Sequence, residues 1–129
     1  MYKEKMVSIT FVAILSIFSS ITVNASTPCE LLGAGNKYYS KDNTKAIDIY
    51  KKVEKIDRIG TDRCTASIYA TIGTIYKKMA DTSLNSEKSV MYYKLSSKYN
   101  RAFATALMCE SGNCIASLDL WKDDSFWNR

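Results

Sequence analysis

The chain contains one proline and five glycines in 129 residues, and this scarcity of helix-breaking residues constrains the fold more than any other feature. Proline and glycine are the residues that most often end or weaken a helix. Apolar side chains recur at the 3.6-residue period of amphipathic helices, and no segment shows the strict alternation of a half-buried strand. The sequence therefore predicts an all-α protein.

Turn and capping residues divide the chain into five to six predicted helices. The first begins at Thr27, which can cap it, with Pro28 suited to the first turn and Glu30 completing a capping box. Further turn and cap signals lie at residues 42–44 and 60–62. The predicted helices cover about residues 28–40, 44–57, 63–79, 86–99 and 101–108, and a short sixth covers 115–121.

Residues 1–25 have the three parts of a secretory signal peptide. Lys3 and Lys5 give a positive start, and the stretch that follows is uncharged and densely apolar at its centre. We expect cleavage after Ala25, where small residues suit signal peptidase. An uncleaved membrane anchor is the alternative, but the Ser and Thr residues within the apolar stretch and the good cleavage site favour the signal peptide.

Residues 26–129 have the length of a single domain and contain no second stretch apolar enough to span a membrane. The predicted location is therefore periplasmic or secreted, and the lack of N-glycosylation sequons beyond residue 25 favours a bacterial protein. The whole chain has a net charge of +5, with the basic residues interspersed among acidic ones along the helices. This pattern predicts a mixed, solvated surface and no nucleic-acid-binding face.

The four cysteines all lie beyond the predicted cleavage site, at Cys29, Cys64, Cys109 and Cys114. An even number in an exported chain is typical of disulfides, and four cysteines allow three pairings. A zinc site is disfavoured because the chain has no histidine and no Cys-x-x-Cys motif. The turn-forming residues 110–113 favour a local bridge between Cys109 and Cys114, which leaves Cys29 and Cys64 as the long bridge. Both bridges are expected to be structural.

Two helical segments of the chain are loosely alike at a fixed offset. Residues 45–52 and 88–95 both begin with lysine and carry tyrosine at the sixth position. Between them lies the sequence Ile-Gly-Thr-Ile-Tyr, in which Gly73 would let a neighbouring helix approach closely and Tyr76 would fill the space between helices. Such similarity at a fixed period is the sign of a helical array.

With these motifs the chain resembles Sel1-like and tetratricopeptide repeats over about residues 30–107. The part most similar to one Sel1-like unit is 72–107, with Ile72-Gly73-x-x-Tyr76, Lys88-Ser89, Tyr92-Tyr93 and alanines at 102, 104 and 106. The part similar to a shorter tetratricopeptide-type unit is 34–57, with Gly35, Tyr38, Ala46 and Tyr50. The Gly-x-Gly-Val loop typical of Sel1-like units is absent, and Ser89 stands where those units usually have alanine.

The resemblance implies antiparallel helix pairs that stack as a short right-handed superhelix, stapled by disulfides. The first and third helices would then be parallel neighbours, which would bring Cys29 and Cys64 at their starts within reach of each other. The alternative is an unrelated helical bundle in which tyrosine and glycine fall at similar positions.

The chain lacks the groupings of residues on which most enzymes depend. It has no histidine for acid–base or nucleophilic catalysis, no glycine-rich phosphate loop and no isolated carboxylate pair of the glycosidase kind. We therefore expect no catalytic residues, no bound cofactor and no metal.

Aromatic side chains are the expected contacts with a partner, because tyrosine and tryptophan are large, rigid and half polar. In the pairs at 38–39 and 92–93 one ring should face outward, and Tyr39 and Tyr92 are the expected outward rings. The core-facing stripe of the predicted helix over 86–99 is expected to consist of Val90, Tyr93 and Leu95. The tail over about residues 119–129 adds Trp121, Phe126 and Trp127, which either bind a partner or fold back over the open end of the array.

The expected function is that of an exported, non-enzymatic protein–protein interaction module. A specific version is an immunity or inhibitor protein that binds a toxic effector enzyme in the periplasm, an expectation from fold and compartment alone. The alternatives are a small secreted enzyme or ligand carrier with a helical pocket, and a structural envelope component.

Overall fold

The computed structural model describes residues 27–115 together with Lys122 and Trp127, and their regular structure is entirely helical. This confirms the all-α prediction for that part of the chain. It contains four helices of eight residues or more and one single-turn helix. They are α2 (Pro28–Asn36), α3 (Asn43–Tyr50), α4 (Val53–Ile56), α5 (Arg63–Thr82) and α6 (Ser86–Glu110).

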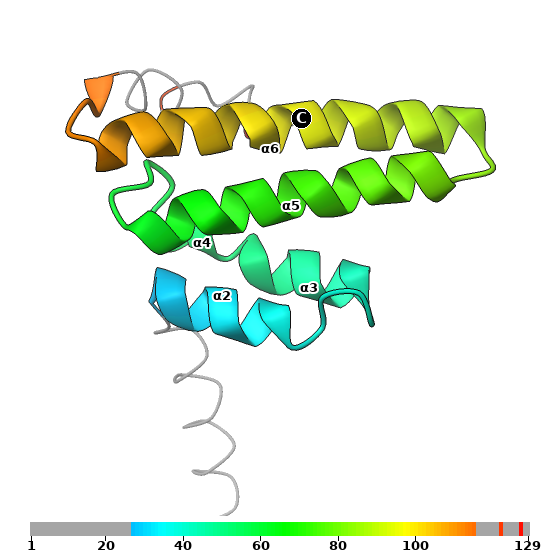
Figure 1. The fold of residues 1–129 in the computed structure, drawn as a ribbon, viewed down its shortest axis with the longest axis horizontal. Helices are drawn as coiled ribbons and strands as arrows, with labels where there is room; N and C mark the ends of the chain where they lie inside the picture. The colour runs from blue at the N-terminus through cyan, green and yellow to red at the C-terminus, as the bar shows by residue number, and fades with distance from the viewer. Residues whose placement is uncertain (1–26, 116–121, 123–126, 128–129) are drawn as a thin grey trace, which may run out of the picture.

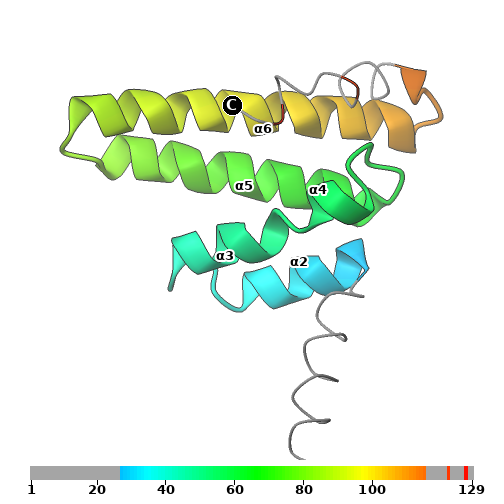
Figure 2. The same ribbon diagram turned by 180° about the vertical axis from the view of Figure 1, so that it is seen from behind.

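The helices form two layers of antiparallel pairs (Figure 1). The long helices α5 and α6 make one hairpin, and α2 and α3 make a shorter pair that packs against the other side of α5. Viewed from behind, α5 again lies in the middle, between α6 and the shorter pair (Figure 2). The helices α2 and α5 run in the same direction, as expected for parallel neighbours. Two unequal pairs are too few to define a superhelix.

Each of the four longer helices begins with a side-chain cap that satisfies a backbone N–H group which the helix itself leaves unpaired. The capping oxygens belong to Thr27, Asp42, Asp62 and Asn85, and they accept from the N–H groups of Glu30, Lys45, Cys64 and Lys88. The starts predicted from the cap residues of the first three helices are therefore confirmed.

The predicted helix over 44–57 is broken into α3 and α4. Around Lys52 the hydrogen bonds change to the tighter three-residue spacing, with the N–H of Lys52 bonded to the carbonyl of Ile49 at 3.2 Å. This turn directs Val53 fully into the core and Glu54 towards α6. No glycine or proline marks the break, so the sequence pattern gave no sign of it.

The two helices predicted over 86–99 and 101–108 are a single helix, α6. Asn100 does not end it, because Tyr99 and Ala102 on either side are both buried on one continuous stripe. The helix ends at Glu110, and Gly112 beyond it has φ +103°, a conformation that favours glycine. The predicted sixth helix lies almost wholly outside the described residues.

The space between α5 and α6 is filled by a ladder of aromatic rings. Neighbouring ring centroids are 5.8 to 6.1 Å apart along the series Tyr92, Tyr76, Tyr99, Tyr69 and Trp127. Beside the ladder the two helices approach closely at Gly73, whose carbonyl accepts a hydrogen bond of 2.8 Å from the hydroxyl of Ser96. The roles predicted for Gly73 and Tyr76 are thus confirmed.

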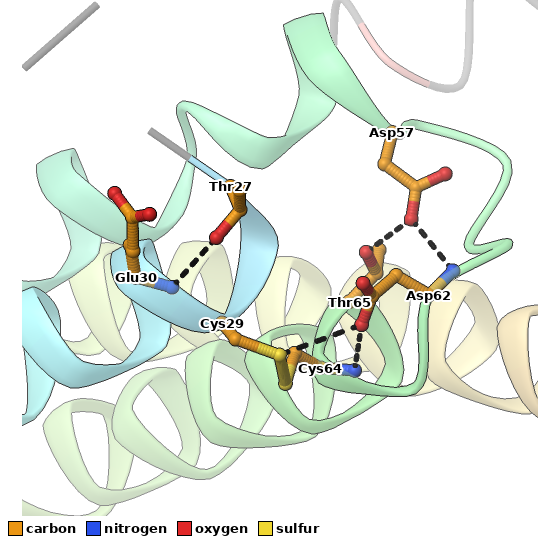
Figure 3. Close-up of a disulfide and its surroundings, with 7 residues drawn as sticks. All are labelled: Thr27, Cys29, Glu30, Asp57, Asp62, Cys64 and Thr65. Atoms are coloured by element: carbon orange, nitrogen blue, oxygen red, sulfur yellow. Dashed lines mark hydrogen bonds between the residues drawn. A yellow bond between two sulfur atoms is a disulfide. The ribbon is translucent and has the colours of Figure 1, made fainter. Parts of the chain in front are cut away.

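Both predicted disulfides are present. Cys29 and Cys64 join the start of α2 to the start of α5 (Figure 3), and Cys109 and Cys114 close the turn that follows α6. Among the described residues, no helix has the length and apolar character needed to cross a membrane.

Candidate protein-binding surface

Four exposed apolar side chains lie between residues 84 and 93, in the turn and the first turns of α6 at the tip of the α5–α6 hairpin. Leu84 in the connecting turn is fully exposed, and Val90 and Met91 in the first turns of α6 are 54% and 47% exposed. The ring of Tyr93 lies nearby and is 45% exposed. We call Leu84, Val90, Met91 and Tyr93 the tip surface. Single exposed apolar residues are ordinary, but a group of them is typical of a binding site.

Hydrogen bonds between the two helices hold the tip surface in place. The hydroxyl of Ser89 donates to the carbonyl of Ala80 at 2.9 Å, and the phenol of Tyr93 donates to the carboxylate of Asp81. The side chain of Asn85 caps α6, which fixes the first turn from which Val90 follows. The tip surface is therefore presented by rigid helices, which lowers the entropy lost on binding.

An open hollow of about 1020 Å³ runs along the outer side of α6, next to the tip surface. Its described lining is Glu87, Val90, Met91, Tyr93, Lys94, Leu95, Ser97, Lys98 and Arg101. All nine described residues of the lining belong to α6, so on its described side the hollow follows one helix. An open hollow along a helix suits an elongated partner better than an enclosed small ligand.

The outer face of α6 is basic. From Lys88 to Cys109 the helix carries four basic residues and no acidic one. Glu87 precedes this run in the first turn, where a negative charge suits the helix dipole. The expectation that basic residues are interspersed with acidic ones is therefore wrong for α6. The run is visible in the sequence, but only a single helix over 86–110 makes it one surface.

The orientation expected for the 92–93 pair is wrong. Tyr92 packs inward against Tyr76, and Tyr93 is the exposed ring. Val90 was likewise expected on the core-facing stripe of this helix, and it is instead 54% exposed. The buried stripe of α6 continues through Tyr99 to Ala106, and a pattern cut at residue 99 does not reveal it. Tyr39 is 40% exposed, as expected, in the turn after α2.

The tail residue Trp127 is buried in the core and is 7% exposed. Its ring packs against Tyr69 and under the guanidinium of Arg58, and its carbonyl accepts a hydrogen bond of 3.0 Å from the Lys98 ammonium. Of the two roles considered for the tail, Trp127 has the covering one, so its ring is not offered to a partner. Trp121 and Phe126 lie outside the described residues.

The partly buried carboxylate of Glu54 lies beside the aromatic ladder. The phenol of Tyr99 donates to Glu54 at 3.2 Å, and burial raises the pKa of this carboxyl above its usual range despite the nearby lysines. Burial also raises the pKa of Tyr99 and of Tyr69, so both phenols keep their protons. The rings fill the space around Glu54, because Tyr69 and Tyr99 are 1% and 0% exposed. This cluster has the character of a satisfied core contact.

A second carboxylate organises the loop before α5. Asp57 accepts hydrogen bonds from the N–H of Asp62 and from the hydroxyl of Thr65 (Figure 3). It also accepts from the backbone N–H and the hydroxyl of Thr61. Burial by itself would raise the pKa of Asp57, but these bonds together lower it below its usual value. Asp57 thereby positions Asp62, which caps α5 beside the long disulfide.

Within residues 27–115, three potential metal ligands converge at Cys29, Asp62 and Cys64. The two cysteines are bonded to each other, and a metal would need them as free thiolates. Asp62 accepts from the N–H of Cys64 at 2.8 Å, so its carboxylate serves the helix start. The grouping therefore works as a covalent staple.

No family model, no curated protein and no solved structure matches the chain. The resemblance to Sel1-like and tetratricopeptide repeats accordingly stays a prediction from the motifs.

Proposed function

We propose that the protein is an exported, non-enzymatic module that binds another protein through the tip surface. The observation that carries this proposal is the cluster of Leu84, Val90, Met91 and Tyr93 on a rigid helical hairpin. Exposed apolar groups that are already ordered lose little entropy on association, and burying them is favourable. The partly buried carboxylate of Glu54 and the buried phenols of Tyr69 and Tyr99 leave no open cleft between them, which supports binding over catalysis.

We further propose immunity as the specific biological role, with a toxic enzyme of the cell envelope as the partner. The support is the predicted signal peptide together with a small helical fold closed by two disulfides. Proteins released outside the cytoplasm commonly depend on such bridges for stability. This part of the proposal is an analogy of fold and compartment.

The test is co-purification of partners from a cell-envelope extract with the exported chain as bait. We compare the wild type with a Val90→Glu/Met91→Glu variant, which places two charges in the centre of the tip surface. The matched control is Leu107→Glu/Met108→Glu, because these residues lie on the same helix and are each 42% exposed. Circular dichroism and urea unfolding establish that both variants are folded.

We expect one protein to be retained by the wild type and by the control, and to be lost with the tip variant. Retention by all three chains would contradict the tip surface as the binding site. Immunity is tested separately, by expressing the captured protein with and without this chain. Growth that is equally poor in both cases would exclude the immunity role.

A further inference from the structure

We propose that the outer face of α6 binds an acidic amphipathic helix of the partner. This inference rests on the proposed function and names the chemistry of the docking element. The apolar part of the site is Val90 and Met91, and the charged part begins with Lys88 and Lys94. Helix-in-groove recognition combines apolar anchors with flanking charges in this way.

The outward stripe of α6 has the spacing of a helix-packing seam. Glu87, Met91, Lys94, Lys98 and Arg101 follow one another at intervals of four and three residues, opposite the stripe that packs against α5. A second helix laid along such a stripe packs nearly parallel or antiparallel to it. The hollow along this stripe offers the space for that helix.

The charges around Met91 favour a partner with a negatively charged binding surface. Lys88 and Lys94 lie three residues to either side of Met91, and both are exposed. Lys98 already donates to the carbonyl of Trp127. We therefore expect Lys88 and Lys94 to form the ion pairs with the acidic helix. An exposed apolar side chain with a base on each side complements a helix whose apolar stripe is flanked by Glu or Asp.

A second copy of the chain fits this face poorly. The stripe is centred on Lys94, so a two-fold arrangement would bring Lys94 against its own symmetry mate. Like charges opposed across an interface cost affinity, so the charge pattern favours a different, acidic protein.

A lipid surface is also a poor match. Helices that bind membranes place their bases on the polar side and a broad apolar side in the lipid. In α6 the apolar side already packs against α5, and Lys94 lies in the middle of the outward stripe. The exposed apolar side chains that line the hollow, Val90, Met91 and Tyr93, lie at one end of it and give little area for insertion.

The test uses the disulfide-bonded protein and a synthetic 18-residue helix with leucines on one stripe and glutamates flanking it. Titration is followed by the backbone amide signals in NMR. We expect shifts confined to α6 between Glu87 and Arg101, and an affinity in the range of about 10–100 µM for so small an interface. Raising NaCl from 50 to 300 mM should weaken binding several-fold.

Two variants and three further probes decide the outcome. Lys88→Glu/Lys94→Glu should lower the affinity about tenfold, and the matched pair Lys41→Glu/Lys52→Glu on the other layer should change it less than about twofold. A scrambled peptide of the same composition should bind at least about fivefold more weakly. Equal binding of the scrambled peptide, or tighter binding of anionic phosphatidylglycerol vesicles or of a DNA duplex, would overturn the proposal.

The result separates this inference from the proposed function. The captured partner could be lost on Val90→Glu/Met91→Glu substitution while the acidic helix does not bind the wild type. That result would support the tip surface as the binding site and would reject an acidic helix as the docking element. If Lys88→Glu/Lys94→Glu leaves both the captured partner and the peptide bound, the charge argument is also rejected.

Discussion

At the scale of single residues, two glycines of α2 differ in what surrounds them. A Cβ on Gly35 would overlap the ring of Tyr50, which is fully buried and donates its hydroxyl to Asn36. A Cβ on Gly33 would meet nothing within 4 Å. Gly35 is therefore needed for the contact between α2 and α3, and Gly33 is not.

We predict that Gly35→Ala lowers the free energy of unfolding by about 1–3 kcal/mol, because the added methyl must displace a packed ring. Gly33→Ala should raise it by up to about 1 kcal/mol, because alanine is the better helix former. Urea unfolding at pH 7 measures both values. Equal effects of the two substitutions would mean that Tyr50 does not pack on α2 as described.

Asp57 gives a prediction for the dependence of stability on pH. Its pKa is lower in the folded state than in the unfolded state. Its contribution to the free energy of unfolding is therefore present above the pKa of the unfolded state, and it is lost as pH falls through the pKa of the folded state. We expect Asp57→Asn to lower the free energy of unfolding at pH 7 by about 2 kcal/mol and to flatten its decline between pH 4 and 2. The exposed Asp48→Asn is the control, and it should lower the free energy of unfolding at pH 7 less than Asp57→Asn does.

Glu54 should act in the opposite sense. Burial raises its pKa in the folded state. Its contribution to the free energy of unfolding is therefore fully present below the pKa of the unfolded state, and it is lost as pH rises through the pKa of the folded state. Gln can still accept the hydrogen bond of Tyr99 without carrying a charge. We expect Glu54→Gln to be at least as stable as the wild type at pH 7, with the difference shrinking as pH falls from 6 to 4. A variant less stable at pH 7 than at pH 4, relative to the wild type, would contradict this.

At the scale of helices, the two disulfides differ in the length of chain that they close. Cys29 and Cys64 are 35 residues apart and Cys109 and Cys114 only 5. Loop-closure entropy predicts a loss of about 4 kcal/mol for Cys29→Ser/Cys64→Ser and about 2 kcal/mol for Cys109→Ser/Cys114→Ser. Urea unfolding of the two double variants compares them. A larger loss from the short bridge would show that the turn after α6 has a role beyond chain closure.

The starts of helices were predictable from the sequence, and their interiors and C-terminal ends were less so. Thr27 and Asp62 act through hydrogen bonds to N–H groups two or three residues away, and such local chemistry can be recognised without a fold. The break at Lys52 and the continuity through Asn100 depend on contacts with other helices. Sequence periodicity contains no information on those contacts until the partner helix is known.

In the candidate site, too, local features were predictable from the sequence and features that depend on the whole helix were not. The pairing of the cysteines followed from one local turn and from elimination. The outward direction of Val90, Met91 and Tyr93 depends on the phase of the whole of α6, which a window ending at Tyr99 does not fix. The acid-free run from Lys88 could have been found by counting charges along a helix of the correct length.

At the scale of the whole molecule, Trp127 connects the C-terminal segment to the core. We expect Trp127→Ala to lower the free energy of unfolding by about 3 kcal/mol, because the ring is almost fully buried between Tyr69 and Arg58. The folded variant should still retain the partner captured by the wild type. If capture is lost while circular dichroism is unchanged, Trp127 contributes to binding and its burial does not describe its role.

The bridge between Cys29 and Cys64 also determines how the chain would respond to mechanical force. A pull applied at Thr27 and Ile115 passes from the start of α2 directly to the start of α5 through the sulfur atoms. Residues 30–63 then bear no tension, and roughly 120 Å of chain stays out of the extension. A pore or protease that unravels the protein from its N-terminal side would have to admit a covalent loop two chains wide before α5 begins to unwind.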